Sequence, residues 1–291
     1  MASKSNSLEQ TLAASLANRK AHSRFRRLTS FPPDHVDFSS NSYLSLSIIP
    51  EVRQELLKFL KAYESSTPRP LPLFGSGGSR LLDGNLPLAE SLEADIARFH
   101  GAPSGLLFNS GFDANVGLFS CLPQPGDVIV YDELIHASAH DGMKMSRAGR
   151  KVAFRHNCVT ENEDDTRDNN KLKSLDAVLK ELANEERASA VGRGENSVFI
   201  AVEGVYSMDG DLAPLSEIVS CVNRRLPRGN GYIIVDEAHS TGLFGKEGRG
   251  LVCELGLEDS VFVRLHTFGK AMSASGGKGT NDRFTPCKRP Y

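Results

Sequence analysis

Residues 232–239 read Tyr-Ile-Ile-Val-Asp-Glu-Ala-His, an apolar run that ends in an acid and, three residues later, an imidazole. Runs rich in Val and Ile are typical of strands that are covered on both faces of a parallel sheet. In an open parallel sheet, ligands gather beyond the carboxyl ends of the strands. The stretch therefore predicts a buried strand that places Asp236 and His239 at a ligand-binding edge.

Further apolar runs alternate with helical patterns along the chain. The expected strands are residues 104–109, 127–131, 197–202 and 261–265, and the helices between them include 88–99 and 171–186. This alternation predicts an α/β fold with a mainly parallel, doubly wound sheet flanked by helices.

The part of the chain before this alternation has a different pattern. It predicts a helix over 7–28, a short strand over 36–40, a turn over 41–47 and a helix over 50–63. Residues 65–86 are rich in Pro, Gly and Ser and predict no regular element. We therefore expect an N-terminal helical segment (1–45) followed by one large domain (46–277).

The other expected strands are also followed by polar groups. They are Ser110, Gly111 and Phe112 after the first run, His136 after the second, Glu203 and Ser207 after the third, and Thr267 and Lys270 after the last. Because parallel strands end at one edge of a sheet, these groups are expected to form one cluster.

The cluster suits pyridoxal phosphate (PLP). The amine of Lys270 can form a Schiff base with the cofactor's aldehyde. The carboxylate of Asp236 can hold the proton on the pyridine nitrogen. His239 is expected to reach the phenolic oxygen, and His136 to stack on the ring. The backbone N–H groups of residues 110–112, at a helix start, suit the phosphate.

Each of these residues also has a purely structural interpretation. Asp236 is a plausible helix cap, lone histidines are usually structural, and a lysine is normally a solvated surface charge. The sequence Asp-Glu-Ala-His also occurs in helicases, but these need an upstream phosphate-binding loop that the sequence lacks. Order and context favour the cofactor site, since four strand ends carry suitable groups.

Composition narrows the function further. The chain has 291 residues, of which 40% are hydrophobic and 24% charged, and its formal net charge is −2. This balance gives no reason to expect nucleic-acid or membrane binding. The five cysteines are scattered without a C-x-x-C pair, and we expect no metal site. A cytoplasmic location is expected. The mitochondrion is an alternative because residues 1–30 are basic, and the peroxisome is a second alternative.

The sequence resembles the α-oxoamine synthases, which belong to the fold-type-I, aminotransferase class II group of PLP enzymes. The matching motifs occur in family order over about residues 10–277. They are DFSSNSYLSLS (37–47), GSGGSRLLDGN (75–85), FNSGFDAN (108–115), DELIHASAHDG (132–142), VEGVYSMDGDLAPL (202–215), VDEAHSTGLFGKEGRG (235–250) and TFGKAMSASGG (267–277). Within the family, TFGKA favours the branch that makes 8-amino-7-oxononanoate.

The resemblance implies a reaction and a set of residue roles. L-alanine would condense with a pimeloyl thioester and lose CO2 to give 8-amino-7-oxononanoate, a biotin precursor. It implies that Lys270, His136 and Asp236 are catalytic and that Arg26 contacts substrate. Ser110, Gly111, Phe112, Glu203, Ser207, His239 and Thr267 would complete the cofactor site. Family members are homodimers that use an amino acid and an acyl-CoA.

The sequence departs from the family after the last motif. Family members continue with a strand and a small C-terminal domain, whereas residues 278–291 read KGTNDRFTPCKRPY, with four basic groups and almost no apolar ones. We therefore expect that 278–291 is an aberrant tail that cannot form this strand, and that the small domain is absent. Two alternatives stay open, an inactive homologue or regulatory partner and a synthase for another acyl-CoA, of sphingoid-like or polyketide type.

Overall fold

The computed structural model describes residues 7–32, 34–65, 75–161, 172–184 and 189–281. The chain divides into two compact units, residues 1–40 and 41–291, and each is described by itself. The first unit contains helix α1 (Ser7–Ala21), which has no buried residue.

Two predictions for the N-terminal unit differ from the structure. The first helix ends at Ala21 rather than at residue 28, and residues 36–40 form no strand. The reason for the second difference is Asp37, whose carboxylate accepts hydrogen bonds from the backbone N–H groups of Ser39 (3.0 Å) and Ser40 (2.9 Å). Such local bonds hold the backbone in a turn and compete with strand pairing.

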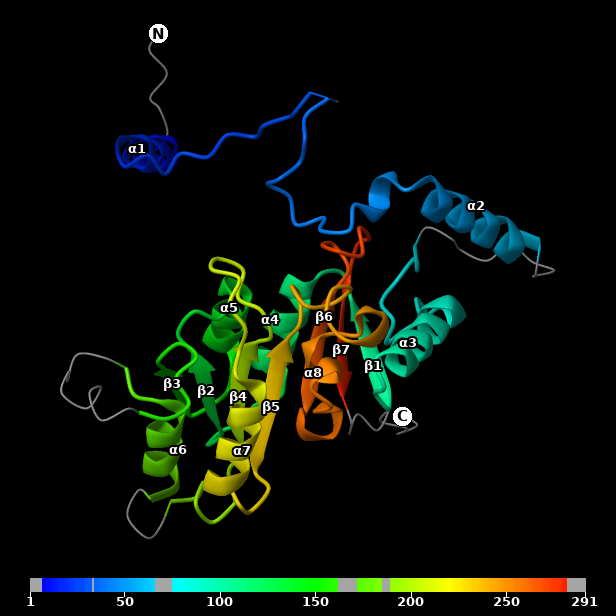
Figure 1. The fold of residues 1–291 in the computed structure, drawn as a ribbon. Coiled ribbons are helices and arrows are strands. Elements are labelled where there is room, and N and C mark those ends of the chain that lie inside the picture. Colours follow the sequence, from blue (N-terminus) through cyan, green and yellow to red (C-terminus); the bar gives the residue numbers. More distant parts are fainter. Residues whose placement is uncertain (1–6, 33, 66–74, 162–171, 185–188, 282–291) are drawn as a thin grey trace. The chain divides into compact units, whose positions relative to one another are not determined.

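The second unit contains a seven-stranded sheet with the order β1-β7-β6-β5-β4-β2-β3 (Figure 1). Its strands are β1 (Ser104–Phe108), β2 (Val128–Asp132), β3 (Arg150–Phe154), β4 (Val198–Glu203), β5 (Gly231–Asp236), β6 (Val263–Thr267) and β7 (Gly277–Asn281). Strands β2 to β6 pair in parallel, and β7 is antiparallel to both β1 and β6. The predicted mainly parallel, doubly wound α/β sheet is confirmed.

Helices cover both faces of the sheet (Figure 1). One buried cluster joins the sheet to α4 (Gly111–Cys121) and α5 (Ala137–Met145). The other joins it to α6 (Leu175–Asn184), α7 (Leu215–Arg225) and α8 (Leu251–Glu254). Neighbouring residues of β2 point into different clusters, Ile129 into the first and Val128 and Val130 into the second. This two-sided burial explains why the inner strands are apolar throughout.

Two further helices precede β1. They are α2 (Pro50–Ser65) and α3 (Pro87–Phe99). Both agree closely with the predicted helices, although α2 has no buried residue. None of the helices in the described part of the chain is both long and apolar enough to cross a membrane.

Strand β7 contradicts the prediction that residues 278–291 cannot form the next strand. Residues 277–281 lie between β1 and β6, and residues 282–291 lie outside the described residues. The strand fits because Lys278 faces Gly105, where a Cβ would lie 1.8 Å from the lysine Cε. The missing side chain at Gly105 makes room for the lysine stem, whose Nζ donates to the carbonyl of Glu93. The glycine at position 105 is what permits the burial of this lysine.

Candidate active site

A cavity of about 350 Å³ opens at the carboxyl ends of the parallel strands. The structure brings to it every predicted cofactor residue except Ser207: Ser110, Gly111, Phe112, His136, Glu203, Asp236, His239, Thr267 and Lys270. Strand register explains this convergence, because Glu203 pairs with Asp236 at the ends of β4 and β5, and Thr267 ends β6. The functional roles of these residues stay predictions.

Asp236 is a buried carboxylate held by neutral donors. Its Oδ2 accepts a hydrogen bond from Asn115 Nδ2 (2.7 Å), and its Oδ1 accepts one from the backbone N–H of Ala238 (3.0 Å). Burial raises the pKa of Asp236, and these two bonds oppose the rise. Within the described residues Asp236 forms no ion pair. It can therefore accept a cationic N–H donor from a molecule in the cavity.

Asn115 and Ser138 connect Asp236 to His136, and the sequence analysis missed both. Asn115 Nδ2 also donates to Ser138 Oγ (3.0 Å), and that hydroxyl lies 2.7 Å from His136 Nδ1. The backbone N–H of Ser138 points at the same ring nitrogen (3.2 Å). Nδ1 is therefore the acceptor, and the neutral ring carries its proton on Nε2. Asn115 ends the quoted motif 108–115 and Ser138 lies in the motif 132–142, but neither residue's chemistry singled it out.

His239 faces a second residue that was missed, Tyr43. The tyrosine hydroxyl lies 2.7 Å from His239 Nδ1, and the two rings meet edge to face at 6.1 Å. Burial, together with the nearby Lys270 and His136, lowers the pKa of His239 to about 4. The ring is thus neutral at physiological pH, and its Nε2 can act as a hydrogen-bonding group toward the cavity. Tyr43 lies in the quoted motif 37–47, but its chemistry gave no signal by itself.

Glu203 shares the cavity wall with Asp236. Burial raises the pKa of Glu203 to about 8, and the neighbouring Asp236 carboxylate is the second cause of this rise. Glu203 is therefore a proton donor at neutral pH as long as the cavity holds no added positive charge.

The start of α4 forms the anion-binding side of the cavity. Ser110 caps the helix by accepting a hydrogen bond from the Asp113 backbone N–H (3.0 Å). Within the described residues, no acceptor takes the backbone N–H groups of Gly111 and Phe112. Glycine is required at position 111, because a Cβ there would lie 2.2 Å from Thr267 Cγ2. The helix start therefore approaches Thr267 closely and presents free N–H groups, as a phosphate site needs.

Ser207 does not line the cavity. It is exposed in the loop that follows β4, and this loop also contains Asp211, a partner of the His156 ring. Nδ1 of that ring lies 2.8 Å from Asp132 Oδ1, and Nε2 lies 2.7 Å from Asp211 Oδ2. Both partners are acceptors, so the ring must carry two protons, and the two carboxylates raise the pKa of His156 against the opposing effect of burial.

Arg26 belongs to the first unit, whereas the residues of the cavity belong to the second. Its contact with substrate stays a prediction. Among the described residues, no group of three or more His, Cys, Asp and Glu side chains is arranged to hold a metal ion.

Comparison with known proteins identifies the family. The model of the aminotransferase class I and II family matches residues 33–280. The chain belongs to this family. An 8-amino-7-oxononanoate synthase of Emericella nidulans is 53% identical over 270 residues, which cover 92% of this chain and 60% of the relative. The aminoacyl transferase sphA of Aspergillus fumigatus is 41% identical, over 84% of this chain and 47% of the relative.

A solved structure agrees with this assignment. Serine palmitoyltransferase from S. paucimobilis with bound PLP is 25% identical and has a TM-score of 0.70, covering 96% of this chain and 65% of that chain. The predicted resemblance to the α-oxoamine synthases, and the PLP-dependent transferase fold, are therefore confirmed. The chain spans about half to two thirds of the length of these relatives.

Proposed function

We propose that this chain binds PLP and belongs to an oxoamine synthase, which joins an amino acid to an acyl thioester with loss of CO2. The observation that carries the proposal is that Lys270 and an unpaired, buried Asp236 line one cavity of about 350 Å³. An amine and a carboxylate on the wall of one small cavity are the two groups that PLP requires.

The residues of the cavity fit this cofactor. Asp236 would accept a hydrogen bond from the pyridine nitrogen and stabilise its positive charge. The N–H groups of Gly111 and Phe112 and the hydroxyl of Thr267 would hold the phosphate. When bound, PLP supplies an electron sink that stabilises negative charge on the α-carbon of an amino acid.

The other side chains bind, orient and move protons. Lys270 would hold the cofactor through its amine, and the free amine is placed to accept a proton from the α-carbon of an amino acid. His136, whose Nδ1 is fixed by Ser138, would cover one face of the ring and exclude water from it. Nε2 of His239 is placed to donate to the phenolic oxygen, since Tyr43 occupies its Nδ1.

The substrates we propose are L-alanine and pimeloyl-CoA, which give 8-amino-7-oxononanoate in the synthesis of biotin. The support is the 53% identity to the Emericella nidulans relative of that name. We further propose a homodimer in the cytoplasm, as the family resemblance implies. All residues that line the cavity belong to the second unit, residues 41–291.

A second candidate is a synthase that uses another acyl donor. It is favoured by the 41% identity to aminoacyl transferase sphA and by the serine palmitoyltransferase structures. The same PLP chemistry serves both candidates, so only the acyl group and the amino acid would differ. A third candidate, a cofactor-binding partner without turnover, agrees with the partial coverage of the relatives.

Cofactor binding is tested first by mixing the purified chain with PLP. We expect a visible absorption band that Lys270→Ala abolishes and that Lys246→Ala, at an exposed lysine, leaves unchanged. A wild-type chain that stays colourless would refute the proposal. Incubation with L-alanine or L-serine and a panel of acyl-CoA chain lengths then separates the candidates. Product from pimeloyl-CoA and L-alanine supports the first, product from long-chain acyl-CoA the second, and no product with any donor the third.

A further inference from the structure

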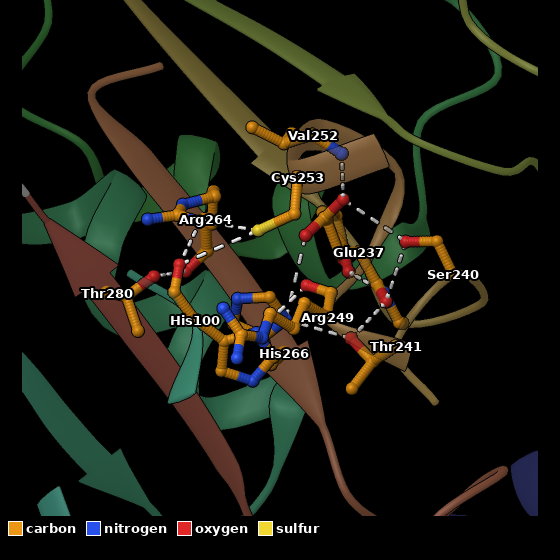
Figure 2. Close-up of polar contacts among 12 residues, drawn as sticks. His100, Glu237, Ser240, Thr241, Arg249, Val252, Cys253, Arg264, His266 and Thr280 are labelled. Carbon is orange, nitrogen blue, oxygen red and sulfur yellow. Dashed lines mark hydrogen bonds and ion pairs between the residues drawn. The ribbon is translucent and has the colours of Figure 1, made fainter. Parts of the chain in front are cut away.

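A buried polar cluster is formed by residues next in sequence to the wall of the cavity, and Figure 2 shows the polar contacts within it. Its centre is His266 and Glu237, both fully buried. Each is the sequence neighbour of a cavity residue, since His266 precedes Thr267 and Glu237 follows Asp236. His266 lies within β6, where successive side chains point to opposite faces, so it lies behind the wall that Thr267 forms. Glu237 directly follows the last residue of β5, and its carboxylate lies beside the ring of His266.

Thr241 connects the two strand ends. Its Oγ1 lies 2.7 Å from the carbonyl oxygen of Glu237 and 2.8 Å from Nδ1 of His266. The carbonyl can only accept, so the hydroxyl proton points to it. Nδ1 of His266 must then donate to the hydroxyl oxygen. Burial lowers the pKa of His266 well below its usual value, so the ring is neutral with its single proton on Nδ1.

The hydroxyl of Thr241 is not needed to satisfy the backbone. The Glu237 carbonyl already accepts the backbone N–H of Thr241 (2.9 Å). What the hydroxyl adds is a connection from the 236–241 turn to the side chain of His266 on β6. The 236–241 turn carries Asp236 and His239, the two groups proposed to face the cofactor ring.

Glu237 secures the same turn from another side. Its Oε1 accepts hydrogen bonds from the backbone N–H of Val252 (2.8 Å) and from Ser240 Oγ (3.3 Å). Its Oε2 lies 3.7 Å from His266 Nδ1. The turn is thus joined to the start of α8 through Glu237 and to β6 through Thr241.

The ring of His266 is itself held in place. It stacks on His100, with ring centroids 3.6 Å apart and an interplanar angle of 19°. His100 is fixed by a hydrogen bond between its Nδ1 and the carbonyl of Arg249 (2.9 Å), and its own carbonyl accepts from Arg264 NH1 (2.7 Å). His266 is therefore a rigid support for Thr241 rather than a side chain that adapts to it.

We propose that Thr241 and His266 are positioning residues of the cofactor site, which fix the 236–241 turn so that Asp236 and His239 meet the PLP ring. This inference rests on the proposed function, because it assigns the turn to a PLP site. Neither residue touches the cavity, and both act through the backbone of the turn.

The test replaces the hydroxyl of Thr241 and keeps its shape. Thr241→Val removes both hydrogen bonds of the hydroxyl, and Thr241→Ser restores them. We expect Thr241→Val to weaken PLP binding about tenfold, as the loss of a buried hydrogen bond implies, and Thr241→Ser to bind within about twofold of wild type. Affinity is measured by titrating the visible absorbance of the bound cofactor.

Thr280 supplies the matched control. It is a buried threonine of the same sheet whose hydroxyl donates to the carbonyl of Arg264 (3.3 Å), a residue outside the 236–241 turn. Thr280→Val is expected to lower the melting temperature about as much as Thr241→Val and to leave PLP affinity unchanged. Equal loss of affinity in both variants, or none in Thr241→Val, would overturn the inference.

A readout without cofactor separates the two proposals. Amide hydrogen exchange of residues 238–240 in the cofactor-free chain should accelerate about tenfold in Thr241→Val, because opening of the turn becomes easier, and should not change in Thr280→Val. If the wild-type chain fails to bind PLP, the proposed function fails while this exchange experiment still tests the anchoring. Unchanged exchange in Thr241→Val would overturn the positioning role by itself.

Discussion

Asp236 illustrates how single residues determine the chemistry of this site. A carboxylate without an ion pair in a buried wall would normally take up a proton, and burial does raise its pKa. Asn115 and the Ala238 N–H oppose protonation by donating to both oxygens. Both donors are neutral, so the negative charge of the carboxylate is not compensated. Asp236 can therefore favour a positively charged ring nitrogen.

Asn115→Leu should therefore weaken PLP binding by about 10- to 100-fold. A hydrogen bond to a charged group contributes about 1.5–3 kcal/mol, and leucine leaves both Asp236 and Ser138 without that donor. Titration of the visible absorbance measures the change, with Asn223→Leu on the exposed side of α7 as the control. Affinity equal to wild type would show that the Asn115 bond does not support Asp236.

The raised pKa of Glu203 predicts a pH dependence of stability in the cofactor-free chain. Between pH 4.5 and about pH 8, the folded chain holds a proton on Glu203 that the unfolded chain has released. Stability therefore falls as pH rises through this window. Glu203→Gln, which cannot titrate, should flatten that decline. Melting temperatures at several pH values between 5 and 8 measure it, and an identical slope in both proteins would contradict the prediction.

Residues at strand ends were predictable, whereas those that hold them in place were not. Asp236 and Lys270 follow apolar runs, and the end of a run shows in the sequence as an abrupt change of polarity. Asn115 and Tyr43 act across the fold, on partners 121 and 196 residues away, and no local pattern marks such contacts. Ser207 follows a strand as well, but its loop turns it to solvent.

Among the elements, β7 is the one that joins the two edges of the cavity. Gly277 pairs with Phe108 of β1 and with Thr267 of β6. A Cβ at Gly277 would lie 2.6 Å from the Gly111 nitrogen, so the start of α4 can approach only because this residue is glycine. The phosphate-binding end of α4 thus depends on β7.

The same strand buries Lys278, and this burial is expected to cost stability. The Nζ donates to the Glu93 carbonyl without a carboxylate in contact, and burial lowers the pKa of Lys278 to about 8. Lys278→Met, which keeps the length of the side chain, should stabilise the fold by roughly 1–3 kcal/mol at neutral pH. Denaturant unfolding measures this gain.

The sign of the pH effect provides a second check on Lys278. Its folded pKa lies below the usual 10.5, so the wild-type chain should gain stability as pH rises from about 8 toward 10.5. The advantage of Lys278→Met should shrink over that range. Lys144→Met, at an exposed lysine of α5, should change stability by less than about 0.5 kcal/mol at any pH. A destabilised Lys278→Met would contradict the prediction.

The inner parallel strands were predictable because both of their faces are covered. Strand β1, at one edge of the sheet, was also predicted, whereas β3 at the other edge and the antiparallel β7 were not. Strand β3 reads Arg-Lys-Val-Ala-Phe and lies at the sheet edge, where its first residues are exposed and the apolar pattern is short. In β7, glycines and a lysine replace the usual apolar residues, and only the pairing partners on both sides make it a strand. In residues 36–40, a local turn at Asp37 outweighs the strand-like pattern.

For the whole molecule, the division into two units determines which functions can be separated. The sheet, both buried clusters and every residue of the cavity belong to residues 41–291. Tyr43, which holds His239, also lies within this unit. Arg26 belongs to residues 1–40, so its predicted contact with substrate is separable from cofactor binding.

Deletion of residues 1–40 should therefore leave PLP affinity within about threefold of the full chain, since the residues that line the cavity all belong to residues 41–291. Circular dichroism and titration with PLP measure the fold and the affinity. If the full chain turns over, Arg26→Ala and the deletion should raise the KM for the acyl donor while the visible band of the bound cofactor stays intact. Loss of the band on deletion would show instead that residues 1–40 complete the cofactor site, and an unchanged KM in Arg26→Ala would remove that arginine from the substrate contacts.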